Sequence, residues 1–181
     1  GRASYQAAKF LKDGSGILLI SDQGRDYSGV MFKAHDSNEL VEIADFDSQD
    51  VEALAITPDQ QSVALVLNRQ GWNEIVIIDR QGKVQKSLPT PMPCVIASVA
   101  WTQDGSALVM PAEGAATSGD IWRCEVATGT YSRLTDAPKA KTTLPDFIEP
   151  TVTSVASFDG LDVPYFVYQP TVAAPASGYP V

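Results

Sequence analysis

Serine, histidine and aspartate side chains could together perform nucleophilic catalysis, but their spacing in this chain argues against it. A serine nucleophile needs a histidine base and an orienting carboxylate, and it commonly sits in a G-x-S-x-G turn. The tetrapeptide DGSG at 13–16 brings Gly, Ser and Gly together without that spacing, and His35 is the only histidine. We expect His35 to lie at the surface where a strand ends. The sequence therefore predicts no catalytic residue within this chain.

The residues that could bind a metal ion or a cofactor are also sparse. Cys94 and Cys124 do not form a C-x-x-C pair, and both are distant from His35 in the sequence, so neither zinc binding nor thiol catalysis is indicated. Three recurring aspartates could form a ring of metal ligands, or each could bond to the backbone of its own turn: Asp13, Asp59 and Asp104. We predict the turn role, and with it no metal, no cofactor and no disulfide.

The charge and composition of the chain limit its partners. The sequence has 22 acidic and 13 basic residues, a net charge of −9, and the acidic residues are scattered. This balance argues against a nucleic acid or an anionic membrane surface as a partner. A hydrophobic content of 44% is typical of a globular protein. No apolar run is long enough to span a membrane and no signal peptide is recognised. We therefore expect a cytoplasmic protein, cut from a longer chain.

A repeat of about 45 residues organises most of the sequence. The tripeptides KDG, PDQ and QDG place their aspartates 46 and 45 residues apart. A bulky residue stands three positions before each aspartate, namely Phe10, Ile56 and Trp101. A period of this length is typical of a four-stranded propeller blade.

The segments within each repeat predict strands rather than helices. Apolar runs of four to six residues alternate with turn residues, and no stretch of ten or more shows helical periodicity. Strands such as ILLI and EIVII carry apolar residues at both parities, as in sheets covered on both faces. We predict an all-β fold, a partial β-propeller of about three blades at about 4–44, 50–88 and 94–135.

The loops between the second and third strands of the blades should share one rim of the propeller. Arg25, Arg69 and Trp72 fall in these loops. They are candidates for contact with a substrate or a partner, and the alternative is that they are ordinary solvated loop residues. Trp101 aligns with Phe10 and Ile56, so we expect it in the core.

The repeat and the segment after it resemble a known family. The stretch TPDQQSVALVLNRQGWNEIVIID at 57–79 resembles propeller blades of prolyl-oligopeptidase-type serine peptidases, including the dipeptidyl-peptidase and acylaminoacyl-peptidase branches. Similar blades occur in Tol-type periplasmic propellers. The stretch IEPTVTSVASFDGLDVPYFVYQP at 148–170 distinguishes the two, because it resembles the hairpin that begins the α/β-hydrolase domain of those peptidases.

The resemblance implies a division of the chain and a role for it. Residues 1–138 would form propeller blades, 139–150 a linker, and 151–181 the first hairpin of a truncated α/β-hydrolase domain. The propeller would be the non-catalytic part of a serine peptidase that admits short peptides to a buried site. Its partners would be the rest of its parent chain, a peptide substrate and, through uncovered blade faces, a second copy of itself. The alternative is a stand-alone protein-binding propeller of the Tol type.

Overall fold

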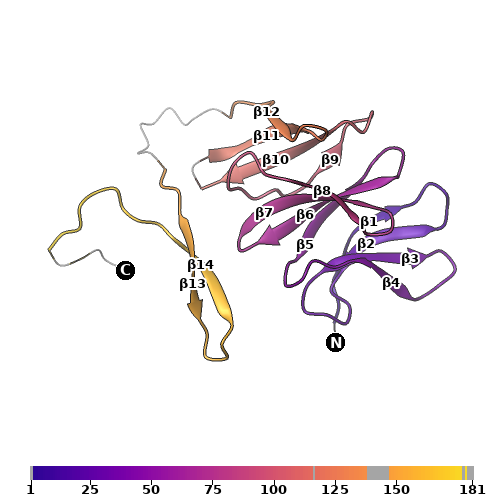
Figure 1. Ribbon diagram of the computed structural model, residues 1–181, viewed down its shortest axis with the longest axis horizontal. Coiled ribbons are helices and arrows are strands. Elements are labelled where there is room, and N and C mark those ends of the chain that lie inside the picture. Colours follow the sequence, from indigo (N-terminus) through magenta and orange to yellow (C-terminus); the bar gives the residue numbers. More distant parts are fainter. Residues whose placement is uncertain (1, 116, 138–146, 177, 179–181) are drawn as a thin grey trace.

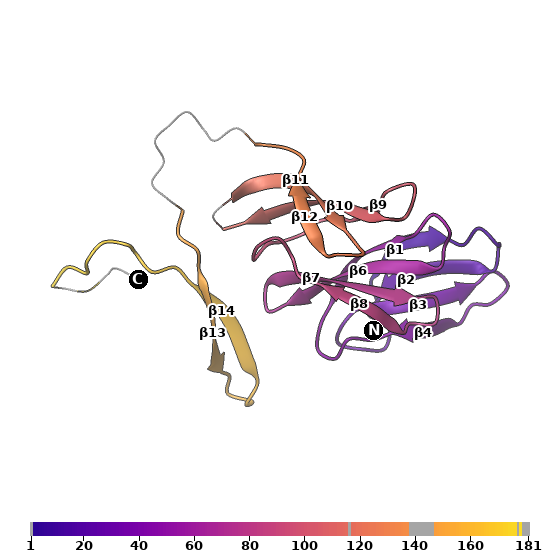
Figure 2. The ribbon, with the colours of Figure 1, turned by 45° about the horizontal axis from the view of Figure 1, so that its top comes forward.

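The chain forms antiparallel sheets arranged as propeller blades. The computed structural model describes residues 2–115, 117–137, 147–176 and 178. Three four-stranded sheets lie side by side, and a separate two-stranded sheet, the hairpin, lies to one side of them (Figures 1 and 2). Within these described residues there is no helix, and so none that could cross a membrane. The predicted all-β partial propeller of three four-stranded blades is confirmed.

Each blade is a meander whose strands pair in chain order. Blade one contains β1 (Tyr5–Phe10), β2 (Gly16–Ser21), β3 (Gly29–Ala34) and β4 (Leu40–Ala44). Blade two contains β5 (Val51–Ile56), β6 (Ser62–Arg69), β7 (Trp72–Asp79) and β8 (Val84–Leu88). Blade three contains β9 (Ala100–Trp101), β10 (Ala107–Gly114), β11 (Thr117–Glu125) and β12 (Thr130–Arg133). The hairpin consists of β13 (Thr151–Ala156) and β14 (Asp162–Val167). Of the predicted linker at 139–150, only 147–150 lie within the described residues.

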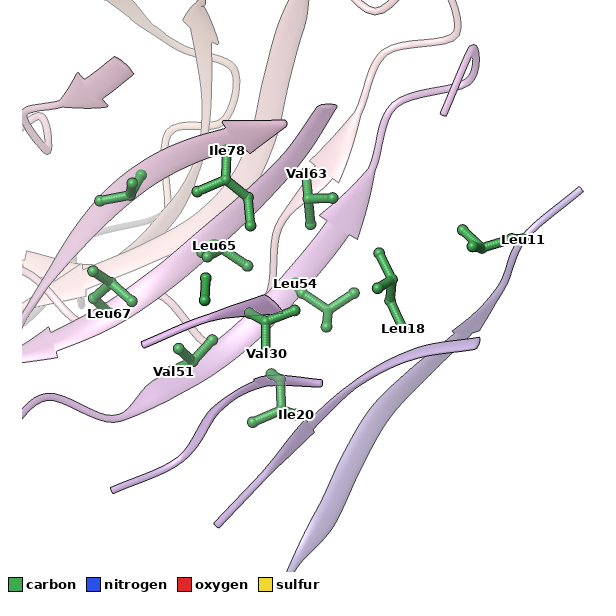
Figure 3. Close-up of a cluster of buried hydrophobic side chains, with 12 residues drawn as sticks. Leu11, Leu18, Ile20, Val30, Val51, Leu54, Val63, Leu65, Leu67 and Ile78 are labelled. Carbon is green, nitrogen blue, oxygen red and sulfur yellow. The ribbon is translucent and has the colours of Figure 1, made fainter. Parts of the chain in front are cut away.

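Two hydrophobic clusters hold the blades together, one on each face of blade two. Along β6, Val63, Leu65 and Leu67 enter the cluster shared with blade one, which Figure 3 shows between the sheets. The alternate residues Ala64 and Val66 enter the cluster shared with blade three. All five are fully buried. Both the odd and the even positions of this strand are apolar because each of its two faces packs against a neighbouring sheet.

The first strands of blades one and three differ in how far their bulky residues are buried. Every residue of β1 is exposed, and Phe10 is 83% exposed. Trp101, the residue that aligns with Phe10, instead packs against the cluster between blades two and three, and its indole Nε1 donates to the Ala55 carbonyl at 2.9 Å. Trp101 is thus partly buried at the edge of this cluster, not fully within the core as expected. Phe10 differs because no sheet lies outside blade one among the described residues.

The first strand of blade three is shorter than the sequence predicts. The run ASVAW at 97–101 suggested a full strand beginning near Cys94, but β9 contains only Ala100 and Trp101. The backbone of the preceding segment bonds to Asn73 of blade two instead. The Ile96 amide donates to the Asn73 Oδ1 at 2.6 Å, and the Asn73 amide donates to the Cys94 carbonyl at 2.9 Å. Val95, which lies between these two groups, still forms an isolated bridge with Glu113 of β10.

The repeated aspartates organise the turn after the first strand of each blade. Each accepts a hydrogen bond from the backbone amide two residues later, at 3.0, 3.0 and 3.1 Å: Asp13 from Ser15, Asp59 from Gln61, and Asp104 from Ser106. Nearby hydroxyl groups also donate to them, from Ser15, Thr57 and Thr102. The predicted turn role of the three aspartates is confirmed.

Because of these hydrogen bonds, we expect the stability of the folded chain to fall at low pH. Donation by Thr102 and Ser106 lowers the pKa of Asp104 to about 2, and donation by Ser15 does the same for Asp13. The pKa of Asp104 is lower in the folded chain than its ordinary value of 3.8 in the unfolded chain. The ionised carboxylate therefore stabilises the folded chain at pH values above 3.8, and this stabilisation is lost as pH falls through about 2. Urea midpoints measured from pH 5 to pH 2 should fall across this window. The Asp104→Asn variant should be less stable at pH 5 and converge with the original protein near pH 2. Parallel curves would contradict this role.

Cys94 and Cys124 are both fully buried and both free. The absence of a disulfide between them agrees with the prediction. The sequence pattern also places Cys94 on the first strand of blade three and Cys124 on the third; the first of these is wrong, because Cys94 precedes the bridge between Val95 and Glu113 and lies outside β9. Cys124 lies on β11, as expected for the third strand of the blade.

Burial predicts that these thiols are protected from reagents. Burial raises the pKa of the Cys94 and Cys124 thiols, and only the thiolate reacts readily. A disulfide reagent such as dithionitrobenzoate should modify neither cysteine in the native chain and both in urea. Rapid reaction of one thiol under native conditions would show that blade three opens locally or is packed differently.

Candidate functional site

Arg25, the first candidate on the rim, is held within blade one. Its guanidinium forms ion pairs with Glu42 at 3.2 Å and with Asp45 at 2.6 Å, and its side chain is only 15% exposed. Gly29 makes room for it, since a Cβ there would lie 2.3 Å from the Arg25 Nη1. These contacts give Arg25 a bracing role between the β2–β3 loop and the end of β4.

Arg69 and Trp72 face each other across the turn between β6 and β7. The two turn residues, Gln70 and Gly71, have φ values of +54° and +89°. Positive φ at both positions is typical of the type I′ turn, which favours glycine. Arg69 forms an ion pair with Glu74, and its side chain remains 56% exposed. Of the two candidate arginines, Arg69 is the one that solvent reaches.

Trp72 contacts the hairpin that follows the propeller. Its ring centroid lies 4.8 Å from that of Phe166 on β14, with an interplanar angle of 63°. This edge-to-face geometry is one that aromatic rings prefer. Figure 1 shows the hairpin on the side of blade two where β6 and β7 meet. The structure thus brings Trp72 together with Phe166 of the hairpin, on the strand position opposite Arg69.

A cavity of about 120 Å³ lies beside this aromatic contact. Residues of the propeller line one side of it and residues around the start of the hairpin line the other: Trp72, Met92 and Pro93, and Glu149, Pro150 and Val152. The lining is mainly apolar with a single carboxylate. The sequence does not indicate this junction, because its two halves are distant in the chain and no local pattern pairs them.

Two larger clefts open between neighbouring blades, of about 420 and 320 Å³. Their polar groups already serve the joints between blades. In the first cleft, Arg80 of blade two pairs with Asp13 of blade one at 3.2 Å. In the second cleft, Asp104 accepts the turn hydrogen bonds described above. We find no arrangement of these groups that would perform chemistry.

Asp13, Ser15 and His35 meet at one end of blade one, but not as a catalytic triad. The Ser15 hydroxyl donates directly to the Asp13 carboxylate at 2.6 Å, and the His35 backbone amide donates to the Ser15 carbonyl at 3.0 Å. A triad requires the imidazole between serine and carboxylate. Among the described residues, no three His, Cys, Asp or Glu side chains are grouped so that they could hold a metal ion.

Comparisons with known proteins relate this fold to peptidases. No protein-family model and no curated protein matches the sequence. Puromycin hydrolase has a TM-score of 0.75 at 14% identity, with 99% of this chain and 28% of that chain covered. A puromycin-hydrolyzing peptidase from Mycobacterium tuberculosis has a TM-score of 0.74 at 16% identity, with 98% and 28% covered. Prolyl oligopeptidase B from Galerina marginata has a TM-score of 0.71 at 18% identity, with 91% and 24% covered.

The likeness extends over almost the whole of this chain but over a small part of each peptidase. The chain spans 24% to 28% of the length of these three structures. Sequence identities of 14% to 18% make this a likeness of fold. The chain therefore has the fold of the propeller segment of a prolyl-oligopeptidase-family peptidase.

Proposed function

We propose that this chain is the non-catalytic propeller segment of a prolyl-oligopeptidase-family serine peptidase, joined to the first hairpin of its α/β-hydrolase domain. The observation that carries the proposal is the extent of the match. Puromycin hydrolase covers 99% of the chain, so the three blades and the hairpin are matched as one piece. A stand-alone propeller would account for the blades and leave β13 and β14 without a counterpart.

The described residues are consistent with a non-catalytic role. Ser15 donates to a carboxylate, and the Asp13 pKa is lowered to about 2, so neither group is prepared for nucleophilic attack or for proton abstraction. Peptide-bond hydrolysis through an acyl-enzyme would be performed by residues elsewhere in the parent protein. The proposed division is 1–138 for the propeller, 139–150 for the linker and 151–181 for the start of the catalytic domain.

The propeller would limit access to the catalytic domain and so select short peptides. Of the three rim candidates, Arg25 forms ion pairs with Glu42 and Asp45, and the Trp72 ring packs against that of Phe166. Arg69 keeps a majority of its side chain in solvent. It is the rim residue that we propose for contact with a peptide carboxylate or an acidic side chain, for which a guanidinium is suited.

The parent gene beyond residue 181 provides the test of this proposal. A segment resembling HGG, followed further on by G-x-S-x-G, would supply an oxyanion site and a nucleophile and would support the peptidase. A stop codon, or another repeat of about 45 residues, would contradict it. That result would favour the alternative, a protein-binding propeller of the Tol type.

A further inference from the structure

The contact between propeller and hairpin centres on one aromatic pair. Trp72 comes from the start of β7 and Phe166 from β14. Beside the two rings, the cavity of about 120 Å³ separates Met92 and Pro93 of the propeller from Pro150 and Val152. A void of this size means that the two parts are not closely packed there. The aromatic pair is therefore the well-packed part of the junction.

The register of the hairpin shows which of its faces meets the propeller. Val152 lies directly opposite Phe166, so both side chains share a face. The other pairs on this face are small or polar, namely Ser154 with Pro164 and Ala156 with Asp162. The opposite face carries Val155 with Val163 and Thr153 with Tyr165. Val155, Val163 and Tyr165 are 56%, 42% and 46% exposed. The more apolar face is thus turned away from the propeller.

Gly71 permits the approach of Phe166. A Cβ at this position would lie 2.6 Å from the Phe166 ring, and φ there is +89°. Gly24, in the corresponding loop of blade one, has a similar φ of +76° but has nothing within 4 Å of the same position. Glycine at 24 is needed for backbone conformation alone, whereas glycine at 71 also makes space for an aromatic ring.

We propose that Gly71 and Trp72 form a docking surface for the hairpin at 151–167, and that Phe166 determines which hairpin face is presented to the propeller. If total apolar content alone decided which hairpin face packs on the propeller, the opposite face would be chosen. The aromatic pair of Trp72 and Phe166 is therefore the specific determinant. Docking through Phe166 leaves the Val155, Val163 and Tyr165 face available to cover other structure. The proposal concerns contacts within this chain and does not depend on the activity of the parent.

Fluorine NMR of the chain labelled with 5-fluorotryptophan tests the docking surface directly. The three tryptophans give three resonances, and Trp72→Phe identifies the one from Trp72. Phe166→Ala should shift the Trp72 resonance and leave those of Trp101 and Trp122, which also report that blade three stays folded. Phe158→Ala, at a fully exposed position of the same hairpin, should shift none of them. An unmoved Trp72 resonance in Phe166→Ala, or an equal shift in Phe158→Ala, would overturn the proposal.

A second label tests the role of Gly71 from the hairpin side and remains informative if Phe166→Ala fails to fold. In chain labelled with 4-fluorophenylalanine, the Phe166 resonance is identified with the conservative variant Phe166→Leu. Gly71→Ala should move the Phe166 resonance toward the position of the exposed Phe158. Gly24→Ala, which strains a similar backbone angle without touching the hairpin, should leave it in place. If Gly71→Ala leaves the Phe166 resonance in place, or if Gly24→Ala shifts it equally, the proposed docking surface is contradicted.

Discussion

Replacing Asn73 with alanine should lower the free energy of unfolding by about 3 kcal/mol, since each buried polar group left without a partner costs about 1–3 kcal/mol. The Asn73 side chain is 6% exposed and joins blades two and three. Its amide nitrogen donates to Glu52 at 2.8 Å and to the Leu67 carbonyl at 3.2 Å, and its oxygen accepts from the Ile96 amide at 2.6 Å. Alanine would remove all three bonds and leave the Ile96 amide buried without its acceptor.

Thermal unfolding measures this effect, and Asn68→Ala is the matched control. For a chain of this size, 3 kcal/mol corresponds to a fall in Tm of roughly 6–12 °C. Asn68 also donates to Glu52, at 2.8 Å, but this bond is exposed, and its oxygen accepts from the Gly71 amide at 2.9 Å in the turn. The loss of these two bonds should cost about 1–2 kcal/mol, at the ordinary net value of about 1 kcal/mol for a hydrogen bond. Equal losses for the two variants would show that Asn73 is not the specific link between the blades.

The uncovered face of blade one should cause the chain to associate with itself. Tyr5 and Phe10 pair with Ser21 and Ile17 on the face opposite the core cluster, and they are 60% and 83% exposed. Leu19 and Met31 on the same face are already buried, so Tyr5 and Phe10 carry its exposed apolar surface. Hiding both rings would contribute on the order of 3–5 kcal/mol, at about 1.5–3 kcal/mol for each fully buried large apolar side chain. That value is a large part of the stability of a domain. We therefore expect dimers or larger species at tens of micromolar.

Light scattering coupled to size exclusion measures this association. The double variant Tyr5→Ser, Phe10→Ser should shift the population toward the monomer without changing the unfolding midpoint of the core. Val41→Ser, at an exposed position of β4, serves as the control because Val41 pairs with Phe32, on the face turned toward blade two. A stable monomer of the original chain, with a sharp unfolding transition, would contradict the uncovered-face prediction.

The sequence predicted the features that depend on local pattern. In every blade an aspartate accepts a hydrogen bond from the backbone of its own turn, so the repeated tripeptide predicts the turn. The unbroken apolar run VALVL predicts that both faces of β6 are buried. Features that depend on contacts distant in sequence were missed. In the sequence Asn73 is an ordinary polar residue of a strand, and only the contact with the segment before blade three makes it a buried link. Likewise, nothing near Trp72 in sequence indicates that its partner is Phe166.

Labelling with a fluorophosphonate serine probe, applied in parallel to this chain and to its full-length parent, tests most directly whether the chain is the non-catalytic part of a serine peptidase. We expect the parent to react once per molecule and this chain not to react, because no serine among the residues that the structure describes has a histidine base. Prior denaturation of the parent should abolish the reaction. Stoichiometric labelling of this chain, or no labelling of a folded parent, would contradict the assignment of the chain as the non-catalytic propeller segment of a serine peptidase.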